Sequence, residues 1–259
     1  MDEIQAKTIQ AIITSPPYWN IKKYSEKQIE GEIGYGQTYV DYLDALGEVW
    51  KECYRVLKDD GTLWINIGNK FHEGRFYPIA FDIAMQAKQL GFVLRNIIVW
   101  HKPNALPIHS NDNLTNKYEQ ILFLSKSNSY KFRKDRVRIP QKYSGKDWGR
   151  REYKMNPKGK DPGNVWTYSP RKGNLSPKIE HPAPFPKVIP RRIILVATDA
   201  DDWILDPFLG SGTTLQVCRE TGRNGIGYEI NTKFKDLIEQ KTGLNVKQIT
   251  DFTLKTALA

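Results

Sequence analysis

Short apolar runs alternate along the chain with longer stretches of helical periodicity. The run Ala11-Ile12-Ile13 is followed by apolar positions that recur every three or four residues from Val40 to Leu57. This recurrence predicts an amphipathic helix, and Gly61 just beyond it is a typical stop signal. Because strand-like and helix-like segments continue to alternate, the pattern favours an α/β fold, with a doubly wound, mostly parallel sheet and helices on both faces.

The same pattern predicts the remaining elements. Helices are expected over residues 78–90, 193–197 and 213–221, with Pro78 at the start of the first and Gly91 after its end. Strands are expected over residues 63–67, 92–100, 120–124, 203–205 and 226–230. From residue 131 to about residue 186 no periodicity is sustained, so this stretch is expected to be an insert without regular structure.

The net charge of +10 is concentrated in that insert. Residues 131–178 hold fifteen Lys or Arg and four Asp or Glu, whereas the rest of the chain is close to neutral. Interleaved aromatic residues make the mixture suited to phosphate contact and base stacking, although a solvated loop would have a similar composition. A chain of 259 residues fits one catalytic domain. We expect its halves over 1–130 and 181–259, separated by a basic insert over 131–180.

Several classes of protein are disfavoured. Cys53 and Cys218 are the only cysteines, too few for a disulfide framework or a Cys-based zinc site, and no metal site is expected. No apolar run approaches the length of a membrane span, and the N-terminus lacks the basic start and apolar stretch of a signal peptide. We therefore expect a cytoplasmic protein without a membrane partner.

A Gly-x-Gly turn lies between an expected strand and an expected helix, in Asp206-Pro207-Phe208-Leu209-Gly210-Ser211-Gly212-Thr213-Thr214. In a doubly wound sheet this is where nucleotide-like ligands bind, and Gly210 and Gly212 let the backbone approach such a ligand closely. Asp206, at the strand end, can accept hydrogen bonds from an ammonium group. Glu229 ends the next strand, where a carboxylate can accept both hydroxyls of a ribose.

Two common ligands are disfavoured at this turn. Leu215 stands where a dinucleotide fingerprint requires a third Gly, and the loop lacks the Gly-Lys-Ser/Thr ending that grips a triphosphate. A nucleotide-dependent oxidoreductase is therefore disfavoured. The expected ligand is a nucleoside that carries an ammonium group.

A second motif, Thr14-Ser15-Pro16-Pro17-Tyr18-Trp19, follows the first strand. Residues before proline are held extended, and Pro17 has no N–H for a sheet ladder, so the loop is stiff. It offers the Ser15 hydroxyl and the Pro16 carbonyl as acceptors. Two acceptors that grip an exocyclic amino group would aim its lone pair at a sulfonium methyl, and Tyr18 would stack on a base rotated out of its helix. Without the cofactor motif, a surface turn would be the better interpretation.

Methylation at a ring carbon is a different chemistry, since it needs a cysteine nucleophile, typically after a proline. Cys53 follows Glu52, and Cys218 follows Val217. The motif therefore favours transfer to an amino group.

Together these motifs resemble the S-adenosyl-L-methionine-dependent DNA amino-methyltransferases of restriction-modification systems, in the circularly permuted (beta) group whose catalytic motif precedes the cofactor motif. The resemblance covers most of the chain. It is carried by the Ser15 to Tyr18 loop, Trp100-His101-Lys102-Pro103-Asn104, Tyr118-Glu119, His181-Pro182-Ala183-Pro184-Phe185-Pro186, the Asp206 to Thr214 segment and residues 225–229. Ser15 and the 181–186 stretch are similar to the N4-cytosine branch, whereas N6-adenine members more often carry Asp at the position of Ser15.

The resemblance implies a Rossmann-like methyltransferase fold, S-adenosyl-L-methionine as cofactor and double-stranded DNA as partner, with Ser15, Pro16, Pro17 and Tyr18 as catalytic residues. It also implies a cofactor site lined by Asp206, Phe208, Gly210, Ser211, Gly212, Thr213 and Glu229 and closed by Ala183 and Phe185. The basic insert would be the target-recognition region, and a cognate restriction endonuclease would act separately. An N6-adenine enzyme, an RNA methyltransferase and an inactive DNA-binding relative stay open as alternatives.

Overall fold

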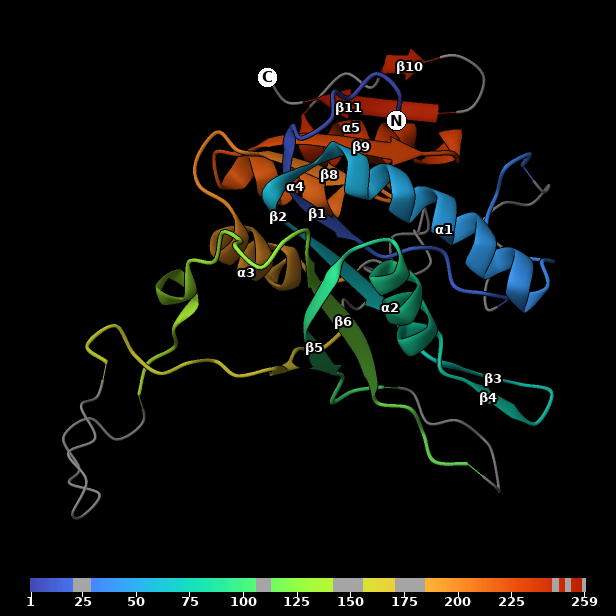
Figure 1. Ribbon diagram of the computed structural model, residues 1–259, viewed down its shortest axis with the longest axis horizontal. Helices are drawn as coiled ribbons and strands as arrows, with labels where there is room; N and C mark the ends of the chain where they lie inside the picture. Colours follow the sequence, from blue (N-terminus) through green and yellow to red (C-terminus); the bar gives the residue numbers. More distant parts are fainter. Residues whose placement is uncertain are drawn as a thin grey trace.

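The computed structural model describes residues 1–20, 29–105, 113–141, 156–170 and 185–243, and the backbone alone of 247–249 and 253–257. In this part of the chain nine strands form one sheet (Figure 1). Its order is β10 (Lys247–Ile249), β11 (Thr253–Ala257), β9 (Asn224–Glu229), β8 (Trp203–Asp206), β1 (Ile9–Thr14), β2 (Leu57–Ile67), β6 (Tyr118–Ser125), β5 (Val93–His101) and β7 (Val165–Thr167). β11 and β6 run antiparallel to their neighbours, and the other strands share one direction. The expected doubly wound, mostly parallel α/β sheet is confirmed.

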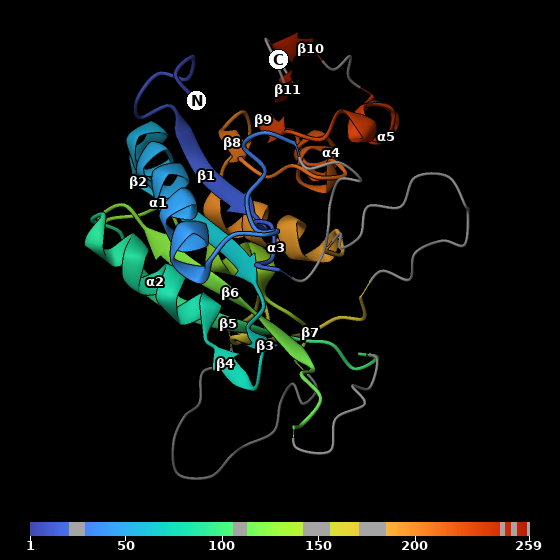
Figure 2. The same ribbon diagram turned by 90° about the vertical axis from the view of Figure 1, so that its right-hand side faces the viewer.

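Helices cover both faces of the sheet, as Figure 2 shows. α1 (Tyr39–Val56) and α2 (Ile79–Gln89) lie on one face, and α3 (Val188–Ala197) and α4 (Thr213–Glu220) lie on the other. α5 (Lys235–Thr242) packs against α4. The short elements are the hairpin of β3 (Lys70–His72) and β4 (Arg75–Tyr77) and the 3-10 turns η1 (Lys134–Val137) and η2 (Thr232–Phe234). Among the described residues, no helix combines the length and the apolar character that crossing a membrane requires.

The central strands are buried on both faces, so neighbouring side chains enter different cores. In β1, Ile12 belongs to the core that contains Leu46 and Trp50 of α1. Ile13, the next residue, belongs to the core beneath α3, together with Ile193. All residues of β1 are buried, which explains why the sequence shows a short apolar run there instead of an alternation of apolar and polar residues.

The predicted elements are present, with boundaries shifted by a few residues, but one detail is wrong. Gly61 does not stop the first helix, which ends at Val56 because Leu57 takes an extended conformation with φ −71° and ψ 137°. Gly61 lies inside β2, where a Cβ would come within 2.7 Å of Leu57 Cγ. A glycine at this position therefore makes room for the buried leucine side chain.

Two elements, η1 and β7, lie in the insert, for which the sequence predicts none. β7 is an edge strand that pairs in parallel with the end of β5 and places Trp166 opposite Trp100. Three residues are too few for a period to be visible in the sequence. Of the basic insert, residues 142–155 and 171–180 lie outside the described part of the chain.

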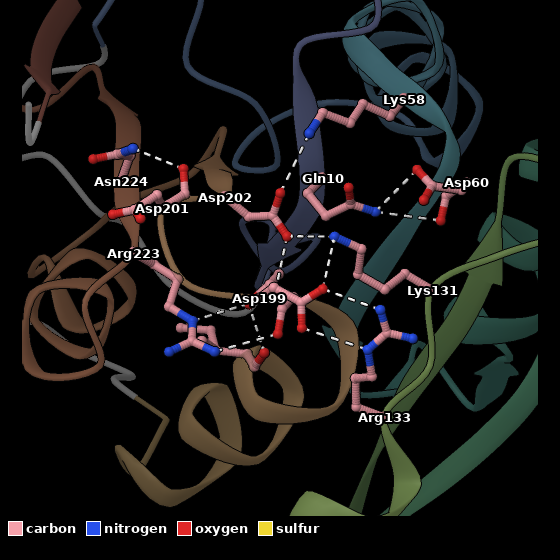
Figure 3. A network of polar contacts seen from close by, with 12 residues as sticks. Gln10, Lys58, Asp60, Lys131, Arg133, Asp199, Asp201, Asp202, Arg223 and Asn224 are labelled. Atoms are coloured by element: carbon pink, nitrogen blue, oxygen red, sulfur yellow. Dashed lines mark hydrogen bonds and ion pairs between the residues drawn. The ribbon is translucent and has the colours of Figure 1, made fainter.

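The first basic residues of the insert lie at the edge of the sheet where β8 begins (Figure 3). Lys131 Nζ donates to Asp202 Oδ2 at 2.7 Å, and Arg133 and Arg136 contact Asp199 at 3.1 and 2.7 Å. Hydrogen bonds from these guanidinium groups hold the pKa of Asp199 well below its usual range. The start of the insert is therefore fastened by ion pairs to the loop between α3 and β8.

Further basic residues of the insert also have acidic partners. Arg138 and Lys158 contact Asp135 at 2.6 and 3.1 Å, and Lys134 contacts Asp161 at 2.5 Å. The count of basic residues in the sequence consequently overstates the positive charge that the described part of the insert can offer to a polyanion.

Candidate active site

A cavity of about 320 Å³ lies at the carboxyl ends of β1, β8 and β9. β8 pairs in parallel with both of the other strands, so the three ends meet at one edge of the sheet. Both sequence motifs therefore reach the same cavity, although about 190 residues separate them. The lining consists of Met1, Ser15, Pro16, Pro17, Tyr18, Ile29, Gly31, Glu32, Ile33, Val49, Phe185, Pro207, Phe208, Leu209, Gly210, Ser211, Thr213, Tyr228, Glu229, Ile230, Asn231 and Phe234.

Glu229, the last residue of β9, lines this cavity. One of its carboxylate oxygens accepts the N–H of Gly210 at 2.7 Å, and the other accepts the N–H of Asn231 at 2.8 Å. Burial raises the pKa of Glu229 to about 7. Each carboxylate oxygen can accept two hydrogen bonds. Glu229 is thus held in one orientation and retains the capacity to accept a pair of ribose hydroxyls.

Asp206 lies behind the cavity wall. It is 1% exposed and is absent from the lining. Its oxygens accept the hydroxyls of Thr14 at 2.7 Å and Thr214 at 2.6 Å and the N–H of Phe208 at 3.1 Å, and burial raises its pKa to about 6. The carboxylate therefore fastens β1 and α4 to the end of β8, and its contact with a ligand ammonium group stays a prediction.

The two glycines of the turn have different positions. Both have a left-handed backbone, with φ +54° at Gly210 and +80° at Gly212, a region that residues with a Cβ rarely adopt. Gly210 lines the cavity and aims its N–H at Glu229, whereas Gly212 lies outside the lining and directs the chain into α4. Phe208, Ser211 and Thr213 line the cavity.

The remaining wall comes partly from residues without a predicted role. Phe185, expected to close the site, is 9% exposed and lines the cavity, whereas Ala183 lies outside the described residues. The turn around Gly31, Val49 of α1 and Asn231 after β9 complete the wall. The close spacing of Gly31, Gly34 and Gly36 was the only sequence signal for that turn, because its residues follow no known motif.

The Ser15 to Tyr18 loop is held by contacts with α1 and β4. The Tyr42 hydroxyl donates to the Pro17 carbonyl at 2.9 Å. Trp19 is 4% exposed, with its ring centroid 4.9 Å from that of Tyr39 and 4.6 Å from that of Tyr77. These contacts hold the carboxyl-terminal side of the Pro-Pro segment, and Ser15 and Tyr18 beside it line the cavity.

Three polar residues lie beside this loop on neighbouring strands. Asn66 Nδ2 is 3.5 Å from Ser15 Oγ and donates to Glu119 Oε2 at 2.7 Å. Lys102 Nζ forms an ion pair with the other Glu119 oxygen. Lys102 and Glu119 stand in stretches that carry the family resemblance, but the sequence assigned no role to them, and Asn66 belongs to neither motif.

Known proteins are similar to this chain in sequence and in fold. Residues 9–240 match the family N6_N4_Mtase, described as DNA methylase. The type II methyltransferase M.BglII of Bacillus subtilis is 32% identical over 243 residues, which cover 92% of this chain and 64% of that protein. The type II methyltransferase M.Cfr9I of Citrobacter freundii is 32% identical over 260 residues, with 89% of this chain and 80% of that protein covered. The chain thus spans slightly less than two thirds of M.BglII and more of M.Cfr9I.

A solved structure extends the comparison to three dimensions. A Thermus thermophilus protein assigned as a DNA modification methylase, in complex with S-adenosyl-L-methionine, has a TM-score of 0.63 and 26% identity to this chain. The match covers 93% of this chain and 90% of that one. The family match spans both the Ser15 to Tyr18 loop and Glu229, and therefore both walls of the cavity. The chain belongs to the DNA methylase family.

Proposed function

We propose that the chain is a site-specific DNA methyltransferase that transfers the methyl group of S-adenosyl-L-methionine to the exocyclic N4 of cytosine in double-stranded DNA. The observation that carries this proposal is the single cavity shared by the Ser15 to Tyr18 loop and by Gly210 and Glu229. Methyl transfer requires that an amino group and a methyl donor be held next to each other in fixed orientation. The cavity offers a binding surface for each of them.

The lining suits S-adenosyl-L-methionine, which is the cofactor. Phe208, Ile230 and Phe234 present apolar surface for an adenine ring, and Glu229 presents acceptors for the ribose hydroxyls. The close backbone turn at Gly210 leaves room beside Glu229 for the nucleoside. When bound, the cofactor supplies an electrophilic methyl group on a sulfonium. The residues of the chain bind it, orient it and exclude water.

Ser15 and the Pro16 carbonyl hold the amino group of the target base. Tyr42 uses the Pro17 carbonyl, whereas no hydrogen bond within the described ranges uses that of Pro16. Two acceptors that take the amino hydrogens draw the nitrogen lone pair out of the base and aim it along one line. Tyr18, which lines the same cavity, stacks on the base after it has left the helix.

Cytosine is favoured over adenine because Ser15, and not Asp, precedes the two prolines. The basic insert of residues 131–180 would hold most of the DNA. The basic residues at its start would contribute little, because ion pairs fasten them to the loop between α3 and β8. The relatives named as type II methyltransferases support a role in a restriction-modification system, with a cognate endonuclease that acts separately. The site of action is the cytoplasm.

Nucleoside mass spectrometry tests this function. The chain is incubated with cofactor labelled in its methyl group and with mixed double-stranded DNA, and a parallel sample contains RNA. N4-methylcytosine from the DNA sample is the expected product. N6-methyladenine in the DNA would instead assign the enzyme to the N6-adenine branch of the family. Labelled nucleosides in the RNA sample alone would show that RNA, and not DNA, is the substrate. No labelled nucleoside in either sample would contradict the proposed activity.

A further inference from the structure

Asn66 lies at the end of β2, beside the catalytic loop that follows β1, and is 5% exposed. Its Nδ2 donates to Glu119 Oε2 at 2.7 Å and stands 3.5 Å from Ser15 Oγ. Lys102 pairs with the other oxygen of Glu119. β1, β2, β6 and β5 are neighbours in that order. The four side chains therefore form a row across the sheet that ends at Ser15.

The surroundings of Asn66 settle the orientation of its amide group. A carboxylate accepts hydrogen bonds, so the amide nitrogen and not the oxygen must face Glu119. The Oδ1 atom is thereby turned away, and it is buried with no hydrogen-bond partner among the described residues. Buried acceptors nearly always have a donor in folded proteins. Stability alone therefore does not account for an asparagine at this position.

Asn69, three residues along the chain, shows the contrasting case of a structural asparagine. Its Nδ2 donates to Gln120 Oε1 at 2.8 Å, and its Oδ1 accepts the N–H of Ala80 at 3.1 Å. Both the nitrogen and the oxygen of its amide have partners, and the two bonds connect the segment after β2 to β6 and to α2. Asn66 makes no such connection with its oxygen, and its nitrogen is directed at the Glu119 carboxylate and the Ser15 hydroxyl.

The Glu119 carboxylate is itself firmly held. The side chains of Lys102 and Glu119 are 19% and 14% exposed, and Lys102 Nζ lies 4.4 Å from the centroid of the Trp100 ring. Gly68 leaves the space between Glu119 and the Tyr18 ring, because a Cβ there would lie 3.4 Å from Glu119 Cγ and 3.3 Å from Tyr18 Cε1. The row is therefore packed directly against the residues of the catalytic loop.

We propose that Asn66 is a positioning residue for Ser15 and that Glu119, paired with Lys102, holds Asn66 in the required orientation. This inference rests on the proposed function. A serine hydroxyl can rotate and can donate or accept, so it accepts an amino hydrogen efficiently only when a lone pair is aimed at the substrate. The Asn66 N–H engages Ser15 Oγ from the side of the sheet, which directs the remaining lone pair into the cavity. The contact of 3.5 Å is long, as catalytic hydrogen bonds often are before substrate binds.

A double-mutant cycle tests the proposal. Single-turnover methylation of target DNA is measured for Ser15→Ala, Asn66→Ala and the double variant. We expect Ser15→Ala to lower the rate about ten- to a hundredfold and Asn66→Ala about tenfold. Because Asn66 acts through Ser15, the double variant should react at the rate of Ser15→Ala alone. Losses that multiply in the double variant, or an unchanged rate in Ser15→Ala, would overturn the positioning role, whereas the absence of methylation by the wild type would overturn the proposed function itself.

Two further variants separate positioning from simple destabilisation. Asn69→Ala is the matched control, and we expect it to lower the thermal midpoint without coupling to Ser15. Asn66→Ala also loses a buried hydrogen bond, the one to Glu119, so its thermal midpoint should fall as well. Its cofactor affinity should stay unchanged, and of the two asparagine variants it alone should couple to Ser15. Glu119→Gln keeps an acceptor for Asn66 Nδ2 and should retain more activity than Glu119→Ala. Equal losses of methylation rate in the two Glu119 variants would contradict the proposal that Glu119 orients Asn66. If Asn66→Ala does not fold, double-mutant cycles that combine each Glu119 variant with Ser15→Ala replace the cycle with Asn66→Ala.

Discussion

Polar residues have different roles at the two ends of the central strands, the structural edge, where β8 begins, and the functional edge, where β8 ends. Where β8 begins, Asp199 and Asp202 accept hydrogen bonds from Lys131 and Arg133, so these four charged side chains are paired with one another (Figure 3). Where β8 ends, Glu229 retains acceptor capacity toward a cavity, and Ser15 presents its hydroxyl there. Matched charges fasten segments of a fold together, whereas oriented groups with remaining capacity bind ligands. The comparison separates a structural edge from a functional one.

The difference also changes how the basic insert is interpreted. In the sequence, all of its Lys and Arg residues are equally suited to DNA. In the structure, Lys131, Arg133 and Arg136 are paired at the edge away from the cavity. A cluster of like charges in a sequence is therefore evidence of a polyanion site only after its internal partners are known.

The largest effect is expected at Glu229. Glu229→Ala removes the acceptor for two ribose hydroxyls, and hydrogen bonds to a charged group are strong, so cofactor affinity should fall about a hundredfold or more. Isothermal titration calorimetry with S-adenosyl-L-methionine measures this loss without DNA. Glu220→Ala is the control, because Glu220 ends α4, is absent from the cavity lining and is paired with Lys187 and Arg191, so the cofactor affinity of this variant should not change. Equal affinities for all three proteins would remove Glu229 from the site.

At the structural edge the expected loss is one of stability. Asp202→Asn weakens the hydrogen bond with Lys131, whose side chain is 15% exposed, and should lower the free energy of unfolding by about 2 kcal/mol. Denaturant unfolding gives this value, and cofactor affinity should be preserved. Asp59→Asn, at an exposed pair with Lys7, should have no measurable effect. A loss of cofactor affinity in folded Asp202→Asn would break the distinction between the two edges.

Cofactor binding should depend on pH through Glu229. Its pKa is raised to about 7 by burial, so below that pH the carboxyl group is protonated and is a poorer acceptor. Because the cofactor favours the ionised form, affinity should rise about tenfold from about pH 6 to about pH 8 and then level off. Titrations at constant ionic strength measure the profile. Glu229→Gln should bind with a flatter profile, and an unchanged slope in that variant would assign the titration to another group.

The smallest effect concerns the insert and its response to salt. Replacing Arg133 and Arg136 by Gln should leave the slope of log affinity for DNA against log salt nearly unchanged, because both are paired with Asp199. Replacing Arg150 and Arg151 by Gln should reduce the slope by about one for each phosphate that these side chains neutralise. Filter binding over a salt series distinguishes the two pairs. A larger change of slope for the Arg133 and Arg136 replacements than for the Arg150 and Arg151 replacements would place the start of the insert on the DNA.

The parts of the site that could be predicted from the sequence are those in which adjacent residues determine the geometry. Pro16 and Pro17 stiffen the Ser15 to Tyr18 loop by their own backbone restrictions. Gly210 and Gly212 turn the chain between a strand and a helix by theirs. The cavity brings these two local motifs together because each follows a strand of the same parallel sheet.

Contacts between distant residues could not be predicted in this way. Asn66 meets Glu119 only because β2 and β6 pair antiparallel in one register, with Asn66 opposite Ile121. Asp206 lies behind the cavity wall, where it accepts the hydroxyl of Thr14, which is 192 residues away. A strand-end carboxylate has the same sequence pattern whether it faces a ligand or a threonine hydroxyl.

Ser15→Ala separates the two proposed roles of the cavity, chemistry at the Ser15 loop and cofactor binding on the Glu229 side. Cofactor affinity and the single-turnover methylation rate are measured on the same preparation. One lost hydrogen-bond acceptor in a dry site predicts a rate about ten- to a hundredfold lower with unchanged cofactor affinity. A rate equal to that of the wild type, or a parallel loss of cofactor affinity, would contradict this division of the cavity.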